Sequence, residues 1–275
     1  MRYVLFAFAL AGAAGCSSNG GGTAGTQQTQ QTSAPEPEPT TVGAANDFVG
    51  ITEGEILLNS NGEKIIVNID GIIERVNIDT LDAIGTFRGG IHEDELHVFL
   101  SETDRSRAGI MAFYDGSLDE FEYSTQFARI DDTTIPLSGT ATLNGGYVGF
   151  LYVVDRDEQY RMQGVAEFVT NFTEGTFRGR ISDREITNFD GSTEYDVEFA
   201  DIVLNLTDIT DAGGFAGSLI GGHILRDDEF TEGSGTYQGL VAGANGDEVV
   251  GGLELTYMSD NDDVLNEIGT FAGGH

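Results

Sequence analysis

Cysteine is almost absent from this sequence, and tryptophan is absent altogether. The 275 residues include one cysteine, Cys16, and no tryptophan. One cysteine cannot form a disulfide within a chain, and a Cys-based zinc site needs several thiolate ligands. The body of the protein must therefore be held together by side-chain packing and strand pairing.

Basic residues are also scarce. Thirteen Lys and Arg residues stand against 46 Asp and Glu residues, which gives a formal net charge of −33. Nucleic-acid binding needs clustered Lys and Arg, so we expect no nucleic-acid partner. The same charge argues against docking of the folded domain on anionic lipid headgroups. Solubility, divalent-cation binding and a basic partner all remain compatible with it.

No apolar run approaches the roughly 20 residues that a transmembrane helix needs. Residues 1–16 instead read as an export signal: Arg2, a short apolar stretch at 3–10, and small residues at 11–15 before Cys16. The position of this cysteine resembles the bacterial lipobox, although Ala13 replaces the usual Leu. The resemblance implies cleavage after residue 15 and acylation, with palmitate among the lipids, at Cys16. The alternative is an ordinary signal peptide with an incidental cysteine.

Residues 16–45 are predicted to be a disordered linker. They are rich in Ser, Gly, Thr and Gln and contain no Lys or Arg. Such a segment buries too little apolar surface to offset its ordering entropy. The Pro-Glu-Pro-Glu-Pro run at 35–39 predicts a stiff, extended piece. We interpret the segment as a tether behind a lipid anchor, and Ser17 and Ser18 favour the outer membrane by resemblance to Gram-negative sorting.

From residue 46 onward, short β-rich runs alternate with turn signals, which predicts an all-β sandwich or barrel. Asn-Gly pairs at 61–62, 144–145 and 245–246 indicate hairpin turns. The best candidates for helix are the short acidic stretches 117–120 and 260–267.

A Gly-x-aromatic-x-Gly unit occurs six times, at 85–89, 145–149, 175–179, 213–217, 235–239 and 269–273. In a strand, its ring and both glycines share one face. The glycines would let a sheet curve and let neighbouring rings lie over the backbone. We favour core packing over an aromatic binding platform, because the unit recurs along the chain instead of clustering.

Residues 138–149, 174–181, 213–217, 235–254 and 268–273 resemble the β-barrel domain of the transferrin-binding protein B family; the factor H-binding protein of meningococci has a similar barrel. The most specific piece is 237–253, where Leu240 and Leu253 replace usual Phe positions and Ala244 stands where Pro is common. The resemblance spans about 134–275. It implies an eight-stranded antiparallel barrel there, a smaller antiparallel, handle-like β region at 46–133, and a surface lipoprotein. No transferrin-contact motif can be matched, so that ligand is not carried over.

Sequence motifs for catalysis are missing. There is no phosphate-binding loop, HExxH or GxSxG, and no nucleophile, base and orienting group can be placed together. The histidines His92, His97, His223 and His275 are scattered. The acidic stretches 155–158 and 260–263 could hold calcium, but they lack full EF-hand spacing, so solvated turns are favoured.

The sequence therefore predicts a monomeric, non-enzymatic outer-membrane lipoprotein without a cofactor or metal. Its membrane partner is reached through the lipid on Cys16, and the domain is expected to be surface-exposed, with a periplasmic position as the alternative. The barrel would bind a protein or a haem or iron-carrier ligand. The alternative function is a structural or adhesive envelope lipoprotein with calcium-stabilised acidic loops.

Overall fold

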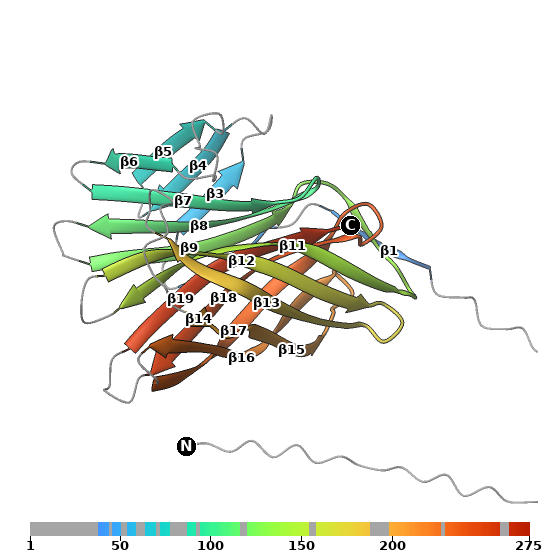
Figure 1. Ribbon diagram of the computed structural model, residues 1–275. Coiled ribbons are helices and arrows are strands. Elements are labelled where there is room, and N and C mark those ends of the chain that lie inside the picture. The colour runs from blue at the N-terminus through green and yellow to red at the C-terminus, as the bar shows by residue number, and fades with distance from the viewer. Residues whose placement is uncertain are drawn as a thin grey trace, which may run out of the picture. The chain divides into compact units, whose positions relative to one another are not determined.

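The computed structural model describes residues 38–43, 46–50, 54–58, 64–69, 72–77, 87–91, 94–115, 120–153, 158–187, 198–226, 229–258 and 264–275 (Figure 1). All of them belong to one compact unit, Pro37–His275. Every regular element in these residues is a strand, and no helix within them is long and apolar enough to cross a membrane.

The described residues contain nineteen strands. Their bounds are β1 (Thr40–Val42), β2 (Asn46–Gly50), β3 (Gly54–Leu58), β4 (Lys64–Ile69), β5 (Ile72–Asn77), β6 (Phe87–Ile91), β7 (Asp94–Glu102), β8 (Ser106–Asp115), β9 (Glu120–Arg129), β10 (Thr133–Ile135), β11 (Thr140–Val153), β12 (Glu158–Asn171), β13 (Thr176–Thr187), β14 (Glu198–Phe199), β15 (Ile202–Asp208), β16 (Gly214–Arg226), β17 (Glu229–Ala242), β18 (Glu248–Met258) and β19 (Val264–Gly274).

Eight of these strands close into an antiparallel barrel. The order around it is β16-β15-β13-β12-β11-β19-β18-β17, and β17 pairs again with β16. The short β14 adds to the edge of β16. Closure leaves no strand edge exposed between these eight strands. The predicted all-β fold, with a C-terminal eight-stranded antiparallel barrel and a smaller antiparallel region before it, is confirmed.

A five-stranded antiparallel sheet, β2-β9-β8-β7-β6, packs against the outside of the barrel. Phe99, Ile110 and Tyr123 of this sheet form one buried cluster with Phe150 and Ile268 of the barrel. A second cluster joins the sheet to outward-facing residues of β17, β18 and β19; its members are Ala108, Phe127, Leu240, Val250 and Ala272. The sheet therefore covers the half of the barrel formed by β11, β17, β18 and β19. A separate three-stranded sheet has the order β3-β4-β5.

The rings of the Gly-x-aromatic-x-Gly units fill the barrel interior. Of the six rings, all but the one at position 87, whose side chain lies outside the description, are buried in one core cluster: Tyr147, Phe177, Phe215, Tyr237 and Phe271. The rings of Phe177 and Phe215 stack with centroids 3.8 Å apart. Core packing, favoured over a binding platform, is confirmed for these five rings.

Glycine at position 269 is required by the ring of Tyr147 on the neighbouring strand. These residues lie on β19 and β11, whose register brings Gly269 opposite Gly149. A Cβ atom at 269 would overlap the Tyr147 ring. We expect Gly269→Ala to lower the free energy of unfolding by about 1–3 kcal/mol, because overpacking forces the ring or backbone to shift. Urea denaturation followed by circular dichroism measures this, with Gly146→Ala as control, since a Cβ there meets nothing within 4 Å. Equal stability of the two variants would contradict this packing.

Two local predictions were wrong. Asn144 and Gly145 form no turn, because β11 continues through them and Gly145 pairs with both Ala166 and Gly273. Residues 264–267, the described part of the helix candidate 260–267, begin β19 instead. There, pairing with β18 and inward placement of Glu267 outweigh the weak local helix signal.

The last part of the predicted linker contains a strand. β1 pairs with β10, with Thr41 opposite Thr134. Residues 1–37, including Cys16, lie outside the described residues. The division of the chain at 15/16, 45/46 and 133/134 therefore stays a prediction.

Candidate functional site

The barrel interior holds a buried charged cluster and is not an open binding cavity. Arg184 of β13 forms an ion pair with Glu267 of β19, and both side chains are fully inaccessible. The Tyr147 hydroxyl donates to Glu267 Oε1 at 2.7 Å, and the Tyr257 hydroxyl donates to Glu267 Oε2. Arg184 also donates to the backbone carbonyl of Ala200 at 2.8 Å. These partners allow the two opposite charges to be buried together.

Arg184 and the two tyrosines of the cluster keep their protons near neutral pH. Burial lowers the pKa of Arg184, but the charge of Glu267 together with the neighbouring Tyr257 and Tyr147 outweighs burial and raises the pKa above its ordinary value. Burial, and then the charge of Glu267, raise the pKa of both Tyr147 and Tyr257 well above the ordinary tyrosine value. Neither hydroxyl can act as a base near neutral pH. The arrangement is therefore a structural one and supplies no general acid–base pair.

A β-bulge in β13 directs Arg184 into the barrel. Gln163 pairs with Glu185 and Val165 pairs with Ser182, so Gly164 alone faces the two residues Asp183 and Arg184. The extra residue reverses the alternation of side chains along the strand. Arg184 consequently points inward, whereas Asp183 and Glu185 are exposed on the outer face.

Asp183 is the residue that makes this bulge possible. Its φ angle is +48°, in the left-handed region that Asp and Asn tolerate better than β-branched residues. We expect Asp183→Gly to change the free energy of unfolding by less than about 1 kcal/mol, and Asp183→Val to lower it by about 1–3 kcal/mol. Urea denaturation of the two variants measures this; similar stabilities would show that the bulge does not depend on this φ angle.

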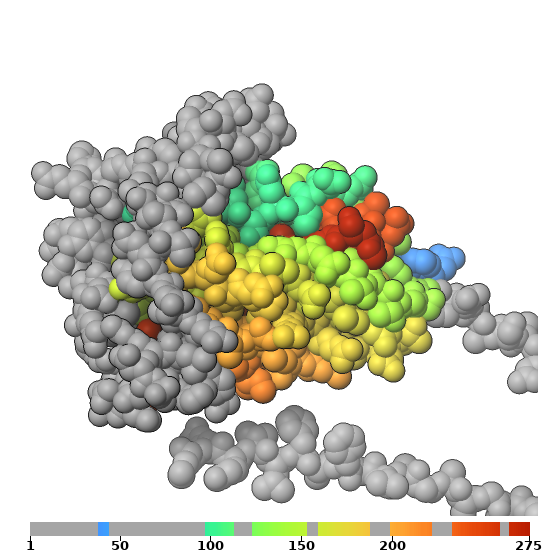
Figure 2. All heavy atoms as spheres, in the orientation of Figure 1, coloured from blue at the N-terminus to red at the C-terminus, as the bar shows by residue number. Residues whose placement is uncertain are grey.

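The other half of the barrel presents its outer surface to solvent. We call the outward-facing surface of β12, β13, β15 and β16 the open face. Figure 2 shows part of it, with yellow atoms of β12 and β13 between the teal atoms of β7 and β8 and the orange atoms of β15 and β16. Large aliphatic side chains are exposed along it, with exposed fractions of 45% for Val165, 42% for Val203, 66% for Leu206 and 47% for Ile220.

Strand register makes two of these aliphatic side chains direct neighbours. Val203 and Ile220 are direct cross-strand partners. Leu206 lies in a second bulge, where Asn205 and Leu206 of β15 face Arg178 alone. The Tyr237 hydroxyl reaches across from β17 to donate to the Asn205 carbonyl, and burial raises the pKa of Tyr237 to about 12. The Tyr237 side chain is thus hydrogen-bonded to the bulge in β15 from which Leu206 projects.

A groove borders the open face where β7 lies near β12 and β13. Its volume is about 500 Å³. Its lining includes Glu102 of β7, Val148 of β11, Val165 of β12, and Asp183 and Glu185 of β13. The groove is thus lined largely by polar groups, three carboxylates among them, and Val165 belongs both to its lining and to the exposed aliphatic residues of the open face.

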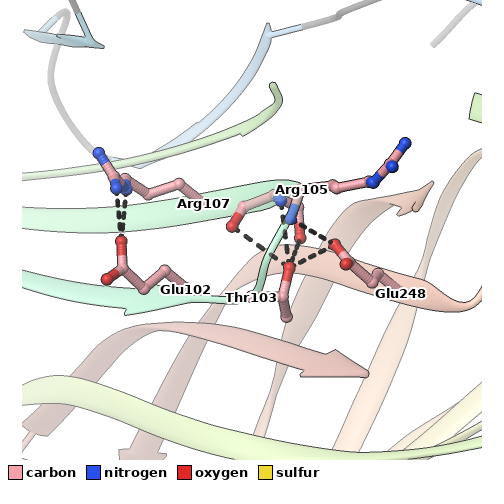
Figure 3. A network of polar contacts seen from close by, with 6 residues as sticks. Glu102, Thr103, Arg105, Arg107 and Glu248 are labelled. Carbon is pink, nitrogen blue, oxygen red and sulfur yellow. Dashed lines mark hydrogen bonds and ion pairs between the residues drawn. The ribbon is translucent and has the colours of Figure 1, made fainter. Parts of the chain in front are cut away.

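The edge of this groove is held in place by a polar network between the five-stranded sheet and the barrel (Figure 3). In the turn between β7 and β8, the Thr103 hydroxyl and the Arg105 backbone N–H donate to Glu248 of β18, the latter at 3.1 Å. Arg107 donates to Glu102 at 2.8 Å. From β9, Arg129 donates to the Val241 carbonyl at 2.6 Å. The turn that follows Glu102 of the groove lining is therefore tied to β18 of the barrel.

The residues singled out in the sequence do not form this site. Cys16, His92, 155–157 and 260–263 lie outside the described residues. His97, His223 and His275 are on β7, on β16 and after β19. Among the described residues, no group of three or more His, Cys, Asp or Glu side chains is placed to hold a metal ion. The exposed aliphatic residues were missed because a polar–apolar alternation cannot show which outer positions another sheet will cover.

These features define an antiparallel β-barrel with a filled interior, an accessory sheet on one side and an open face on the other. Solved structures of transferrin-binding protein B are similar to it. A mutant of the Haemophilus parasuis protein is 16% identical over 84% of this chain and 44% of that chain, with a TM-score of 0.49. The protein from serogroup B Neisseria meningitidis is 14% identical over 83% and 43%, with a TM-score of 0.47.

The chain spans a little under half the length of these structures. No family model and no curated protein matches the chain. The sequence resembles the barrel domain of transferrin-binding protein B, and the solved structures of that protein show the same likeness. This likeness concerns the fold alone.

Proposed function

We propose that this protein is a non-catalytic binding protein, anchored to the bacterial outer membrane through a lipid on Cys16, whose barrel captures a protein ligand on its open face. The observation that carries the proposal is the exposure of Val165, Val203, Leu206 and Ile220 on one uncovered half of the barrel. Contiguous exposed apolar residues on a soluble domain mark interaction sites.

The filled interior supports the same conclusion. Rings and the Arg184–Glu267 cluster occupy the space within the strands, so recognition is expected on the outside. An outer sheet face suits a macromolecule better than a small molecule, which binds in concave pockets. A protein ligand, an iron-carrier protein included, is therefore favoured over free haem.

The apolar stretch before Cys16 and the polar residues after it support a tethered position at the cell surface. Protease treatment of intact cells tests this location. We expect release of the domain, whereas protection would indicate a periplasmic protein. In the same cells, a Cys16→Ala variant should no longer be found in the membrane fraction.

Site-specific cross-linking tests the open face. A photo-cross-linking amino acid at Leu206 in the full-length protein is expected to give a discrete adduct with one protein in intact cells. The same amino acid at Asp131, an exposed residue between β9 and β10, is the control and should give none. Absence of an adduct at 206, or equal adducts at both positions, would count against this function.

A further inference from the structure

Resting on the proposed function, we infer that the open face takes a basic protein segment. Aliphatic side chains of the segment pack on Val165, Val203 and Ile220, and a Lys or Arg side chain lies in the groove beside Asp183 and Glu185.

The apolar part of the surface sets the shape of the segment. Val165 lies on β12, Val203 on β15 and its cross-strand partner Ile220 on β16. These residues therefore span the strands from the groove to β16, with Ser182 and Arg180 of β13 between Val165 and Val203. Each of these side chains is more than two-fifths exposed, so each still has apolar area to bury in a complex.

The carboxylates at the groove end favour a cation. Among the described residues, Asp183 has no ion-pair or hydrogen-bond partner for its side chain, and Glu185 accepts only a 3.3 Å hydrogen bond from Gln163. Glu102, at the opposite rim, is already paired with Arg107. The one cation in the lining, Arg161, is almost fully buried and lies over the ring of Phe99 at 4.9 Å. The accessible charge beside Val165 is thus negative.

The arginines of the open face do not reverse this preference. Arg180 forms an ion pair with Asp201 and lies opposite Glu167 across the strands. Of the two exposed arginines of β13, Arg178 is the one without a charged partner among the described residues. An acidic partner, or a second copy of this chain, would also approach against a formal net charge of −33. A basic segment is instead attracted over a distance, which raises its association rate at low salt.

Selection from a phage-displayed library of random peptides on the full-length protein tests the inference. We expect enriched peptides that combine Lys or Arg with Val, Ile or Leu. Their affinity should fall about tenfold in the Asp183→Asn/Glu185→Gln double variant, with most of the loss in the association rate, since rim charges act chiefly on that rate. The double variant Asp131→Asn/Asp132→Asn makes the same change of charge at exposed residues outside the face and should bind as the unmodified protein does.

A second variant separates this inference from the proposed function. Val203→Glu/Ile220→Glu places charge among the exposed aliphatic residues and should abolish binding of any peptide seated on the open face. If the selected peptides were acidic or uncharged and lost binding in this variant, the preference for a basic segment would be overturned. The open face would still be the binding surface. Peptides that bind all variants equally would overturn both. If no peptide is enriched, the inference is overturned. The proposed function would then be tested by cross-linking at Leu206 alone.

Discussion

Replacing Arg184 by methionine is expected to lower the free energy of unfolding by about 3–5 kcal/mol, because it leaves the carboxylate of Glu267 buried without its positive partner. Both side chains are inaccessible to water, so neither can be solvated in place. The tyrosine hydroxyls of Tyr147 and Tyr257 would remain as its only donors in the described barrel. Urea denaturation followed by circular dichroism measures the loss.

The double variant Arg184→Met/Glu267→Gln tests the cause. Removing both charges should recover a large part of the lost stability, since the penalty comes from the uncompensated ion and not from the missing attraction alone. Arg178→Met removes an exposed arginine six residues earlier on β13 and is expected to change stability by less than about 0.5 kcal/mol. If Arg184→Met matched this control, the buried ion pair would have no structural role.

Replacing Phe177 by alanine is expected to cost about 3–5 kcal/mol of unfolding free energy, as deletion of a buried aromatic ring does. The ring is fully buried and stacks on Phe215, and it also approaches Phe168 with a centroid distance of 5.8 Å. Within this range, the cost depends on how far the neighbouring rings of Phe168, Phe215 and Tyr237 can move into the cavity. Thermal and urea unfolding report it directly.

Leu206→Ala is the matched control for Phe177→Ala. It also removes a large apolar side chain, but one that is 66% exposed, so stability should change by less than about 0.5 kcal/mol. Conversely, Leu206→Ala should weaken binding of the protein ligand at the open face. A Phe177→Ala variant that stayed stable but lost binding would instead favour the aromatic-platform interpretation of the Gly-x-aromatic-x-Gly units.

Much of the barrel could be predicted from the chain because its pattern is local and repeated. A ring between two glycines on one strand face implies a sheet that curves around its aromatic side chains, whatever the neighbouring strand is. The turn at 245–246 was also predictable from its Asn-Gly pair. In the structure, Gly243 and Gly246 both take positive φ angles there. Asn144-Gly145 carries the same dipeptide signal and misled, because pairing with β12 and β19 holds it extended.

Long-range features were hidden from the sequence for a physical reason. Arg184 and Glu267 are 83 residues apart, and their meeting depends on one inserted residue at Asp183 that inverts side-chain alternation. The same insertion places Asp183 and Glu185 at the groove. No local sequence pattern predicts a bulge of this kind, because its position is set by the register of two strands.

The sequence by itself determined the strand-rich composition, the glycine–aromatic lining of a barrel, and the strong negative charge, because each depends only on which residues are present and how they are spaced. Its lone Cys16 motivates the proposed anchor. Only the tertiary structure decided which half of the barrel stays uncovered. Outward-facing Val250 and outward-facing Val203 look alike along their strands, yet one is buried beneath the five-stranded sheet and the other is exposed. That difference arises from sheet-on-barrel packing between segments far apart in the chain, and it places the open face.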